Sequence, residues 1–272
     1  MNINTRYIKT ILILLVTATS AAQAGGISVD AGLTPGKDRW MLRTQYRFME
    51  MENSMMTMQN HVVPLVMAYG VSSNFTLMVR TMIVNRIVKM NNKIQTTGIN
   101  DAYVLLKFKA YRENTEKYVF GIAPYVASNI PIGNPEISDR TWNPDLGLSV
   151  SFRPRPWSLD FTSSYTFMDA LNKTESEERN NLNLNIAFSS TIPLGNSDIA
   201  LSPVFEVSYN KELDANANKG SKQDQLFLSP GFMFIKSSII LEILYQNPVY
   251  QQSNESLMKS KSRFLLGLRY MF

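Results

Sequence analysis

The sequence predicts an all-β fold: a transmembrane antiparallel β-barrel of about 12 strands that follows a cleaved signal peptide. Three observations support this prediction. The chain begins with a secretory leader, its remaining length repeatedly alternates apolar and polar residues, and its last strand ends on an aromatic residue. Together these features are typical of a protein of the bacterial outer membrane.

Residues 1–24 have the parts of a signal peptide. Arg6 and Lys9 precede an apolar stretch over residues 11–16, and residues 22–24 (Ala-Gln-Ala) form a small-x-small cleavage site. The apolar stretch is far shorter than the roughly 20 residues that a transmembrane helix needs. We therefore expect export, with Gly25 as the mature N-terminus.

Composition excludes several classes of protein. The leader removes two of the 27 Lys and Arg and none of the 22 Asp and Glu, so 25 basic residues face 22 acidic ones and the mature charge is +3. This charge is too small to indicate a nucleic-acid partner. The absence of Cys excludes a disulfide framework. A mean hydropathy of −0.12 also fits a membrane barrel, in which only every second residue must be apolar.

The last ten residues show the alternation clearly. One parity is wholly apolar, because it holds Phe264, Leu266, Leu268, Tyr270 and Phe272, whereas the other parity carries two arginines. Alternate side chains of a strand point to opposite faces, so one face is suited to lipid. We expect outer-membrane lipid as a partner, and recognition of the terminal Phe272 by the barrel-insertion machinery.

The same period of two recurs along the chain and predicts twelve strands. They are expected over residues 40–51, 61–70, 75–90, 100–112, 118–131, 142–152, 157–168, 181–192, 199–210, 225–235, 238–250 and 263–272. Short turns near residues 72, 115, 154, 195 and 236 alternate with longer polar loops near 54, 95, 136, 175, 218 and 255. Outer-membrane barrels place short turns in the periplasm and long loops outside. The expected organisation is a leader (1–24), a periplasmic lead-in (25–38) and the barrel (39–272).

Charged residues fall on the parity that a barrel turns toward its lumen. The candidate lumen-lining residues are Arg43, Arg47, Arg80, Lys107, Lys109, Asp160, Glu206, Glu242 and Arg269. A soluble barrel would need the opposite arrangement, which makes an exported soluble sandwich or lipocalin-like barrel the less favoured fold. Two interpretations stay open: opposed basic and acidic walls that select solutes, or salt bridges that plug a narrow barrel. A register error of one residue would turn these side chains outward.

Two other residue types deserve consideration as sites. His61 is the single histidine, and no nucleophile motif accompanies it, so we expect neither an enzyme nor a cofactor. Ten of the fifteen methionines lie within residues 41–90. Thioether sulfur is a soft ligand suited to Cu(I) or Ag(I), and Met51, Met55, Met56 and Met58 in the first long loop are candidate ligands. The alternative is that these side chains pack into the barrel opening.

Several stretches resemble a known family. They are residues 97–102 (TGINDA), the stretch from Ile122-Ala123-Pro124 to the Pro-x-Gly of residues 131–133, and residues 157–161 (WSLDF), with weaker similarity in residues 33–48 and 64–70. They are similar to the transporter-like outer-membrane proteins grouped under a meta-pathway of phenol degradation. The resemblance covers about residues 30–272 through diffuse strand and turn signatures. Asn100-Asp101 stands where the family has Gly-Asp. The resemblance implies passage of small, often aromatic or hydrophobic compounds, and it supplies no site residues.

The sequence thus predicts a porin-like channel of the Gram-negative outer membrane for passive passage of small organic solutes. No ATP-binding motif appears. The alternative function is that of a copper- or silver-linked outer-membrane protein that uses its methionine-rich loop. The identity of the solute, the oligomeric state and whether the lumen is open or plugged are not encoded in these patterns.

Overall fold

The computed structural model describes residues 25–90, 92–168, 179–195, 198–214, 223–252 and 258–272. The predicted leader lies outside the described residues, as do parts of the loops expected near 175, 218 and 255. Within these described ranges the chain forms fifteen strands: β1 (Trp40–Glu52), β2 (Thr57–Gly70), β3 (Phe75–Lys89), β4 (Lys93–Ile99), β5 (Ala102–Phe108), β6 (Tyr111–Asn114), β7 (Tyr118–Ile130), β8 (Pro144–Pro154), β9 (Trp157–Phe167), β10 (Arg179–Ser190), β11 (Ile192–Pro193), β12 (Ile199–Asp214), β13 (Asp224–Lys236), β14 (Ile239–Gln252) and β15 (Lys259–Met271).

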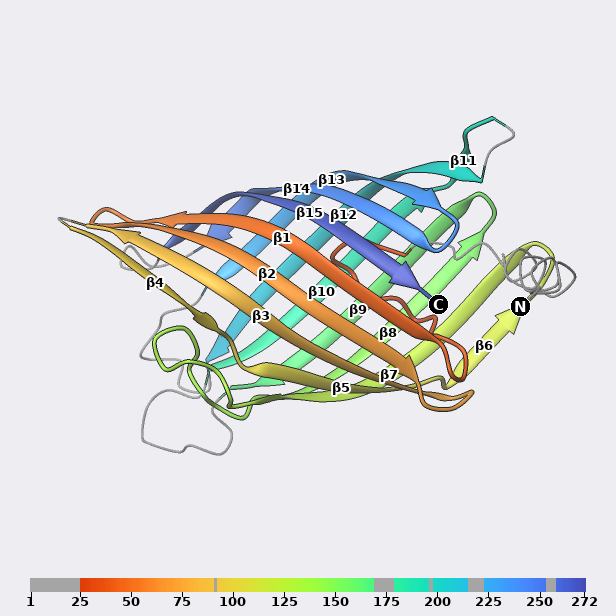
Figure 1. Cartoon of the computed structure of the whole chain (residues 1–272), viewed down its shortest axis with the longest axis horizontal. Coiled ribbons are helices and arrows are strands. Elements are labelled where there is room, and N and C mark those ends of the chain that lie inside the picture. The colour runs from red at the N-terminus through yellow and green to blue at the C-terminus, as the bar shows by residue number, and fades with distance from the viewer. Residues whose placement is uncertain (1–24, 91, 169–178, 196–197, 215–222, 253–257) are drawn as a thin grey trace, which may run out of the picture.

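These strands form one closed antiparallel barrel (Figure 1). Strands that occupy consecutive positions in the ring pair with each other. β1 pairs with β15, and β10 pairs with β12 to complete the ring. The pieces β4, β5 and β6 share the fourth position, and the short β11 pairs with β12 beyond the end of β10. The barrel therefore has twelve positions, and the predicted all-β fold and strand number are confirmed.

The first and last strands close the barrel through their ends. The register runs from Met41 opposite Met271 to Glu52 opposite Lys259. Beyond it, the Trp40 N–H donates to the Phe272 carbonyl at 2.8 Å, and the Phe272 N–H donates to the Trp40 carbonyl at 3.0 Å. The C-terminal residue thus completes the hydrogen-bonded ladder, which leaves no unpaired edge at this seam.

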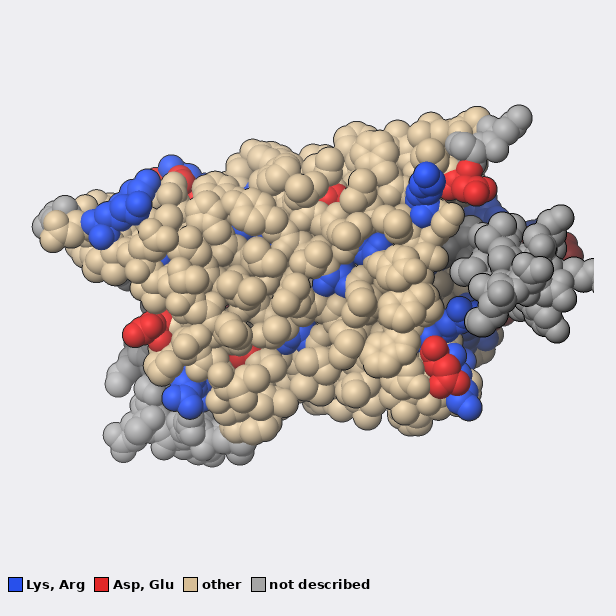
Figure 2. Space-filling view, viewed as in Figure 1, with Lys and Arg blue, Asp and Glu red and all other residues tan. Residues whose placement is uncertain are grey.

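The two faces of the barrel wall differ as the alternation predicted. Leu42, Leu266 and many other large apolar side chains point outward and are exposed, whereas Glu242 and Arg269 point inward and are buried. Figure 2 shows that charged residues gather at the two ends of the barrel, with a largely uncharged surface between them. An exposed apolar band of this size is suited to contact with lipid. The described residues contain no helix that is long and apolar enough to cross a membrane.

Aromatic pairs encircle the end of the barrel at which the short turns lie. Trp40 stacks near Tyr69 with ring centroids 4.3 Å apart, and Phe75 lies 5.1 Å from Phe108. Similar contacts join Tyr118 to Phe152, Trp157 to Phe188, and Tyr270 to Phe272. Rings of amphipathic aromatic side chains are typical of the membrane interface in outer-membrane barrels.

The fourth strand is broken rather than continuous over residues 100–112. Lys107 pairs with Tyr125 and Tyr111 pairs with Ile122, so three residues on one side face two on the other, which is the pattern of a β-bulge. The Lys109 N–H instead donates to the Asn74 carbonyl at 2.8 Å. The bulge therefore interrupts the regular alternation of side chains at Lys109.

The methionine-rich stretch is a tight hairpin and not a long loop. β1 continues to Glu52 and β2 begins at Thr57, which leaves residues 53–56 as the connection. The Asn53 side chain accepts hydrogen bonds from the N–H groups of Met55 and Met56 at 3.0 and 2.9 Å and so stabilises the turn. The predicted loop was therefore too long, because a polar composition does not show where strand pairing ends.

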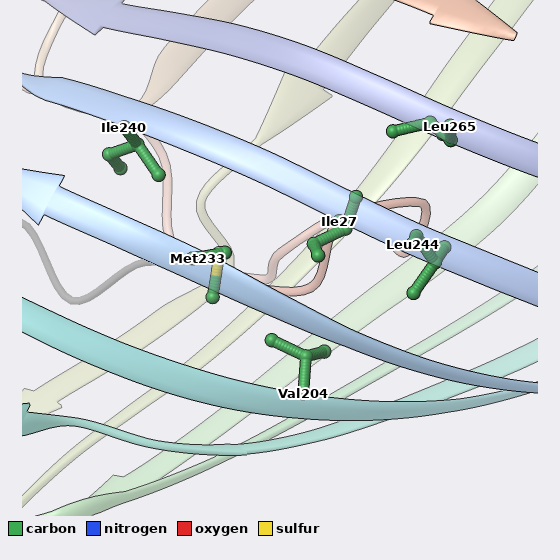
Figure 3. Close-up of a cluster of buried hydrophobic side chains, with 6 residues drawn as sticks. All are labelled: Ile27, Val204, Met233, Ile240, Leu244 and Leu265. Carbon is green, nitrogen blue, oxygen red and sulfur yellow. The ribbon is translucent and has the colours of Figure 1, made fainter.

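Residues 25–38 were expected as a lead-in outside the barrel, but the structure places their first part inside it (Figure 1, red). Ile27 is fully buried and packs against Val204, Met233, Ile240, Leu244 and Leu265, which line the inner face of β12 to β15 (Figure 3). Burying one Ile side chain contributes roughly 2–3 kcal/mol. This apolar anchor, together with the hydrogen bonds described below, accounts for the position of the segment.

Candidate functional site

The candidate site is the barrel lumen, which contains a non-strand segment of the chain. We call residues 25–33 the luminal segment. Its backbone follows no regular secondary structure, so its N–H and C=O groups have no ladder partners of their own. Inward-facing side chains from around the barrel supply those partners instead.

Glu206 on β12 holds the N–H groups of the segment. Its carboxylate accepts hydrogen bonds from the Ile27 N–H and the Ser28 hydroxyl, and from the Ser28 N–H at 3.0 and 3.1 Å. Glu206 is completely buried. A carboxylate that accepts several N–H and O–H bonds makes strong, charge-assisted contacts, so Glu206 is a principal attachment point.

Asp160 on β9 supports the start of the segment. It accepts a hydrogen bond from the Gly26 N–H at 3.2 Å and pairs with Arg153, whose Nη2 lies 3.1 Å from Oδ1. The Ser151 hydroxyl also donates to Asp160. The buried carboxylate is thus satisfied by one backbone N–H of the segment and two inward-facing side chains, as a buried charge requires.

Glu242 on β14 organises the part of the lumen near the seam between β15 and β1. Arg43 Nη2 lies 2.7 Å from its Oε2, Gln45 donates to the same oxygen at 3.0 Å, and Arg269 pairs with Oε1. The two arginines also reach the segment, because Arg43 donates to the Ile27 carbonyl and Arg269 donates to the Gly26 carbonyl at 3.0 Å. Glu242 therefore holds the two donors that bind the backbone carbonyls.

Lys107 on β5 binds the middle of the segment. Its ammonium forms a salt bridge with Asp30 and donates to the Ala31 carbonyl at 2.9 Å. Thr162 on β9 donates to the Asp30 carbonyl at 2.7 Å. Side chains from β1, β5, β8, β9, β12, β14 and β15 thus meet on one short stretch of chain, which lies across the lumen.

The segment approaches the barrel wall closely at Gly32. Its N–H donates to the Ser151 hydroxyl at 2.9 Å, and a Cβ atom at this position would lie within 2.8 Å of the Gly121 and Ser149 carbonyl oxygens and the Ser151 nitrogen. These are backbone atoms of β7 and β8, which cannot move aside as a flexible side chain would. Only glycine fits this contact.

The structure places the predicted lumen-lining residues in three groups. Six of them surround the luminal segment: Arg43, Lys107, Asp160, Glu206, Glu242 and Arg269. Arg47 and Arg80 point into the lumen without touching the segment; Arg47 donates to Gln45 at 2.6 Å, and Arg80 lies 4.5 Å from the Tyr103 ring. Lys109 lies in the connection between β5 and β6, at the bulge, and its place in the lumen stays a prediction.

Sequence reasoning missed several partners in this network. Arg153 was assigned to a turn because prolines follow it, and Asp30 was assigned to the lead-in. The parity of Arg153 matches that of Ser149 and Ser151, which also face inward, so the alternation could have indicated it. Nothing in the pattern of residues 25–33 shows that this stretch folds back into the barrel.

The remaining candidate residues lie at the wall and at the far end of the barrel. Met51 and Met58 are directly opposite each other on β1 and β2, while Met55 at the turn is 71% exposed and Met56 is half-buried. His61 lies on the outer face, where its Nδ1 is 2.7 Å from the Tyr46 hydroxyl oxygen. It therefore sits away from the luminal charges.

The loop-side end of the lumen contains a polar pocket of about 320 Å³. Amide side chains dominate its lining, which comprises Asn181, Asn183, Asn210, Lys211, Glu212, Gln223 and Gln225 from β10, β12 and β13 and their vicinity. Amides can donate and accept hydrogen bonds without carrying charge. The loop-side vestibule is thus hydrophilic on this wall.

A closed barrel with an apolar exterior, aromatic rings at its interface and charged side chains inside defines an outer-membrane β-barrel protein. A family model described as "Putative MetA-pathway of phenol degradation" matches residues 59–239, more than half of the chain. The chain belongs to this family, and it is a protein of the bacterial outer membrane.

Solved structures share the fold. An outer membrane channel from Pseudomonas putida F1 superimposes with a TM-score of 0.61 at 13% identity, covering 92% of this chain and all (100%) of the other. The beta domain of the Bordetella autotransporter BrkA gives a TM-score of 0.51 at 10% identity, covering 88% and 100%. Comparison with curated proteins finds no match. At identities this low, the superpositions show a common architecture alone.

Proposed function

We propose that the protein is a passive channel of the outer membrane for small organic compounds, and that the luminal segment controls passage. The observation that carries this proposal is the way in which the segment is held. Apart from packing by its apolar side chains, its contacts with the barrel are hydrogen bonds and salt bridges to inward-facing side chains. Such contacts can be exchanged for water when the segment moves.

The lumen has the chemistry of a solute path rather than of a sealed core. Charged and hydroxyl side chains face inward on most strands, and the loop-side vestibule presents amides. Rings of charged and polar side chains set the selectivity of membrane pores. The family description and the fold shared with a bacterial outer membrane channel point the same way.

Small aromatic or hydrophobic compounds are the proposed solutes. The family description refers to phenol degradation, and the inner wall offers both polar groups and the apolar surface around Ile27. A compound with one polar group and one apolar face matches such a mixed lining better than an inorganic ion or a sugar does. We further propose that the protein is not an enzyme, since a lumen of this kind serves transfer without chemistry.

A reversible cross-link tests whether the segment controls passage. An ideal Cβ at Gly26 would lie 2.7 Å from the Ala187 Cβ. A disulfide needs about 3.8 Å between Cβ atoms, so a shift of about 1 Å would allow Gly26→Cys with Ala187→Cys to form one. The chain has no native cysteine, so the reaction would be specific.

We expect the refolded double variant in planar bilayers to be closed when oxidised and to regain the wild-type conductance after reduction. The Gly26→Cys single variant is the control, since it cannot form the cross-link. Interruption of the current by phenol would support an aromatic solute. If the oxidised and reduced forms conducted equally, the luminal segment would not be a gate, and if the wild type and both variants were silent, the channel function would be wrong.

A second candidate function is metal binding by the methionine hairpin. The observation that favours it is the direct cross-strand pairing of Met51 with Met58, close to Met55 and Met56. Paired thioethers are suitable ligands for Cu(I) or Ag(I). Titration of Cu(I) against a competing chelator should show binding that is lost when the four residues are replaced by leucine. Equal binding by a variant with Met67→Leu and Met78→Leu would serve as the control.

A further inference from the structure

We infer that the basic wall above the luminal segment is a binding site for the carboxylate of a small aromatic anion. The site consists of Arg47 on β1, Arg80 on β3 and Arg263 on β15, here called the arginine triad. The inference rests on the proposed channel function and names the class of solute that it would take.

The charges next to the luminal segment are matched, but those of the arginine triad are not. Arg43 and Arg269 share Glu242, and Lys107 and Arg153 pair with Asp30 and Asp160. In the part of the chain that the structure describes, the triad forms no salt bridge with a carboxylate. A charge withdrawn from bulk water is costly unless an opposite charge is near it.

The contacts that the triad does make are incomplete. Arg47 donates to the Gln45 side chain at 3.0 and 2.6 Å, and Arg263 donates to Ser260 at 3.0 Å. The Nε atoms of Arg80 and Arg263 are buried and have no hydrogen-bond partner among the described residues. These guanidinium groups therefore retain donors for a ligand, and the planar guanidinium matches a carboxylate in geometry.

The carboxylates nearby are already engaged. Asp145 on β8 interacts electrostatically with Arg80, but it accepts hydrogen bonds from the Tyr103 hydroxyl at 2.7 Å and from Thr166 at 3.3 Å. Glu242 and Glu206 also attract Arg47, whereas Arg43 and Arg80 repel it. Both glutamates are bound to the luminal segment or to its arginines. The wall consequently keeps an excess of positive charge.

Aromatic rings lie beside two of the arginines. The Arg80 guanidinium carbon is 4.5 Å from the Tyr103 ring centroid, and that of Arg263 is 4.2 Å from the Phe227 ring centroid. The flat stack of a ring and a guanidinium offers an edge to which a second aromatic group can pack while its carboxylate meets the N–H donors. This combination favours an aromatic carboxylate over a simple inorganic anion.

The triad stands on strands that lie near one another in the barrel, and Arg80 is close enough to Arg47 to interact with it electrostatically. The Arg263 guanidinium instead lies over Phe227, which comes from β13. β15, β1, β2 and β3 are consecutive in the barrel. Arg263 lies opposite Met49, two residues from Arg47, and Arg80 shares a row with Arg43 through Val66. A solute that descends the lumen toward the luminal segment would therefore meet the three guanidinium groups in succession.

Equilibrium binding of a matched pair of probes tests the inference without requiring passage. The full chain, refolded in zwitterionic micelles, is titrated with 4-fluorobenzoate and with 4-fluorobenzamide, and fluorine NMR reports binding. The two probes share size and shape but differ in charge. A charge-assisted pair adds about 1.4 kcal/mol or more, so we expect the benzoate to bind at least about tenfold more tightly than the benzamide.

Variants identify the residues that bind. Arg47→Gln, Arg80→Gln and Arg263→Gln should each weaken benzoate binding about threefold to tenfold and leave benzamide binding unchanged. Lys93→Gln is the matched control, because this substitution removes the same charge from an exposed residue at the loop-side end of β4. Equal affinity for the two probes, or full benzoate affinity in the folded arginine variants, would overturn the inference.

The outcomes separate this inference from the proposed function. If the wild type conducts and the cross-link closes it, but benzoate shows no preference, the arginine site is wrong and the channel stands. If benzoate binds through the triad while the bilayers stay silent, the site stands and the channel function is wrong. Migration of the folded band on unheated gels shows which variants have folded.

Discussion

At the scale of single residues, Glu242 has the largest share in the luminal network. It is completely buried, and it binds Arg43, Arg269 and Gln45, so it neutralises two cations that also hold the luminal segment. A carboxylate in this position stabilises the barrel and determines where the arginine side chains point. The network thus depends on one acidic residue more than on any one of its basic partners.

Replacing Glu242 with Gln should destabilise the folded barrel. The two arginines would lose their counter-charge while remaining inside the lumen, and breaking a buried ion pair from one side costs about 3 kcal/mol. Urea unfolding in lipid vesicles measures the change in the free energy of unfolding. Glu116→Gln in the exposed turn before β7 should leave it within about 0.5 kcal/mol of wild type. Equal stability of both variants would show that the lumen is wet enough to screen the arginines.

Sequence patterns predicted the direction of many side chains but not their partners. Alternation assigned Glu206, Glu242 and Arg269 to the inner face because the period of two depends only on strand geometry. The contacts of Glu206 with Ile27 and of Arg269 with Gly26 could not be predicted, since the luminal segment carries no motif. Likewise the bulge beside Lys109 could not be predicted, because bulges depend on pairing with a neighbouring strand.

At the scale of elements, the luminal segment is the part that departs most from expectation. The Gly and Pro residues of positions 25–38 indicated a turn-rich lead-in, which correctly excludes a strand. However, local propensity does not report the surface on which an irregular segment packs. The inner apolar cluster around Ile27 offers a possible signal, because Met233, Ile240 and Leu244 stand on a parity that is polar elsewhere in the barrel.

Gly32→Val should displace the luminal segment without affecting the barrel. The added side chain would collide with backbone atoms of β7 and β8, so the segment must withdraw. Single-channel recording should show an open probability about tenfold higher, equivalent to about 1.4 kcal/mol. Gly36→Val is the control, since a Cβ there meets its nearest atom at 3.7 Å. Identical recordings from the two variants would contradict the proposed gating role.

At the scale of the whole molecule, the fold could be predicted because a barrel repeats one simple rule. Twelve segments of alternating polarity, an even strand number and alternating short and long connections require only the geometry of strands and lipid. The exact ends of strands were less predictable, as the extension of β1 and β2 into the methionine hairpin shows. Hydrogen bonding between neighbours extends strands beyond the point at which the apolar pattern stops.

Phe272 belongs to this scale because it lies at the seam that closes the barrel. We expect Phe272→Ala to lower the amount of folded protein in the outer membrane several-fold, because the insertion machinery would lose a terminal aromatic residue. Spontaneous refolding into micelles should change little, since both backbone hydrogen bonds with Trp40 remain possible. Heat-dependent gel mobility measures both. An equal loss of folded protein in micelles would assign the defect to the seam itself. Tyr270→Ala is the control, because it removes a nearby aromatic side chain.

The contacts of the luminal segment also imply an order of events during assembly. The segment precedes all the strands in the chain, yet Glu206 and Arg269, which bind it, and Glu242, which holds Arg269 and Arg43, lie in the second half of the chain. These three side chains face one another only after β12, β14 and β15 have joined the ring. The residues ahead of the first strand are therefore the last to take their position, and their binding in the lumen follows closure of the barrel.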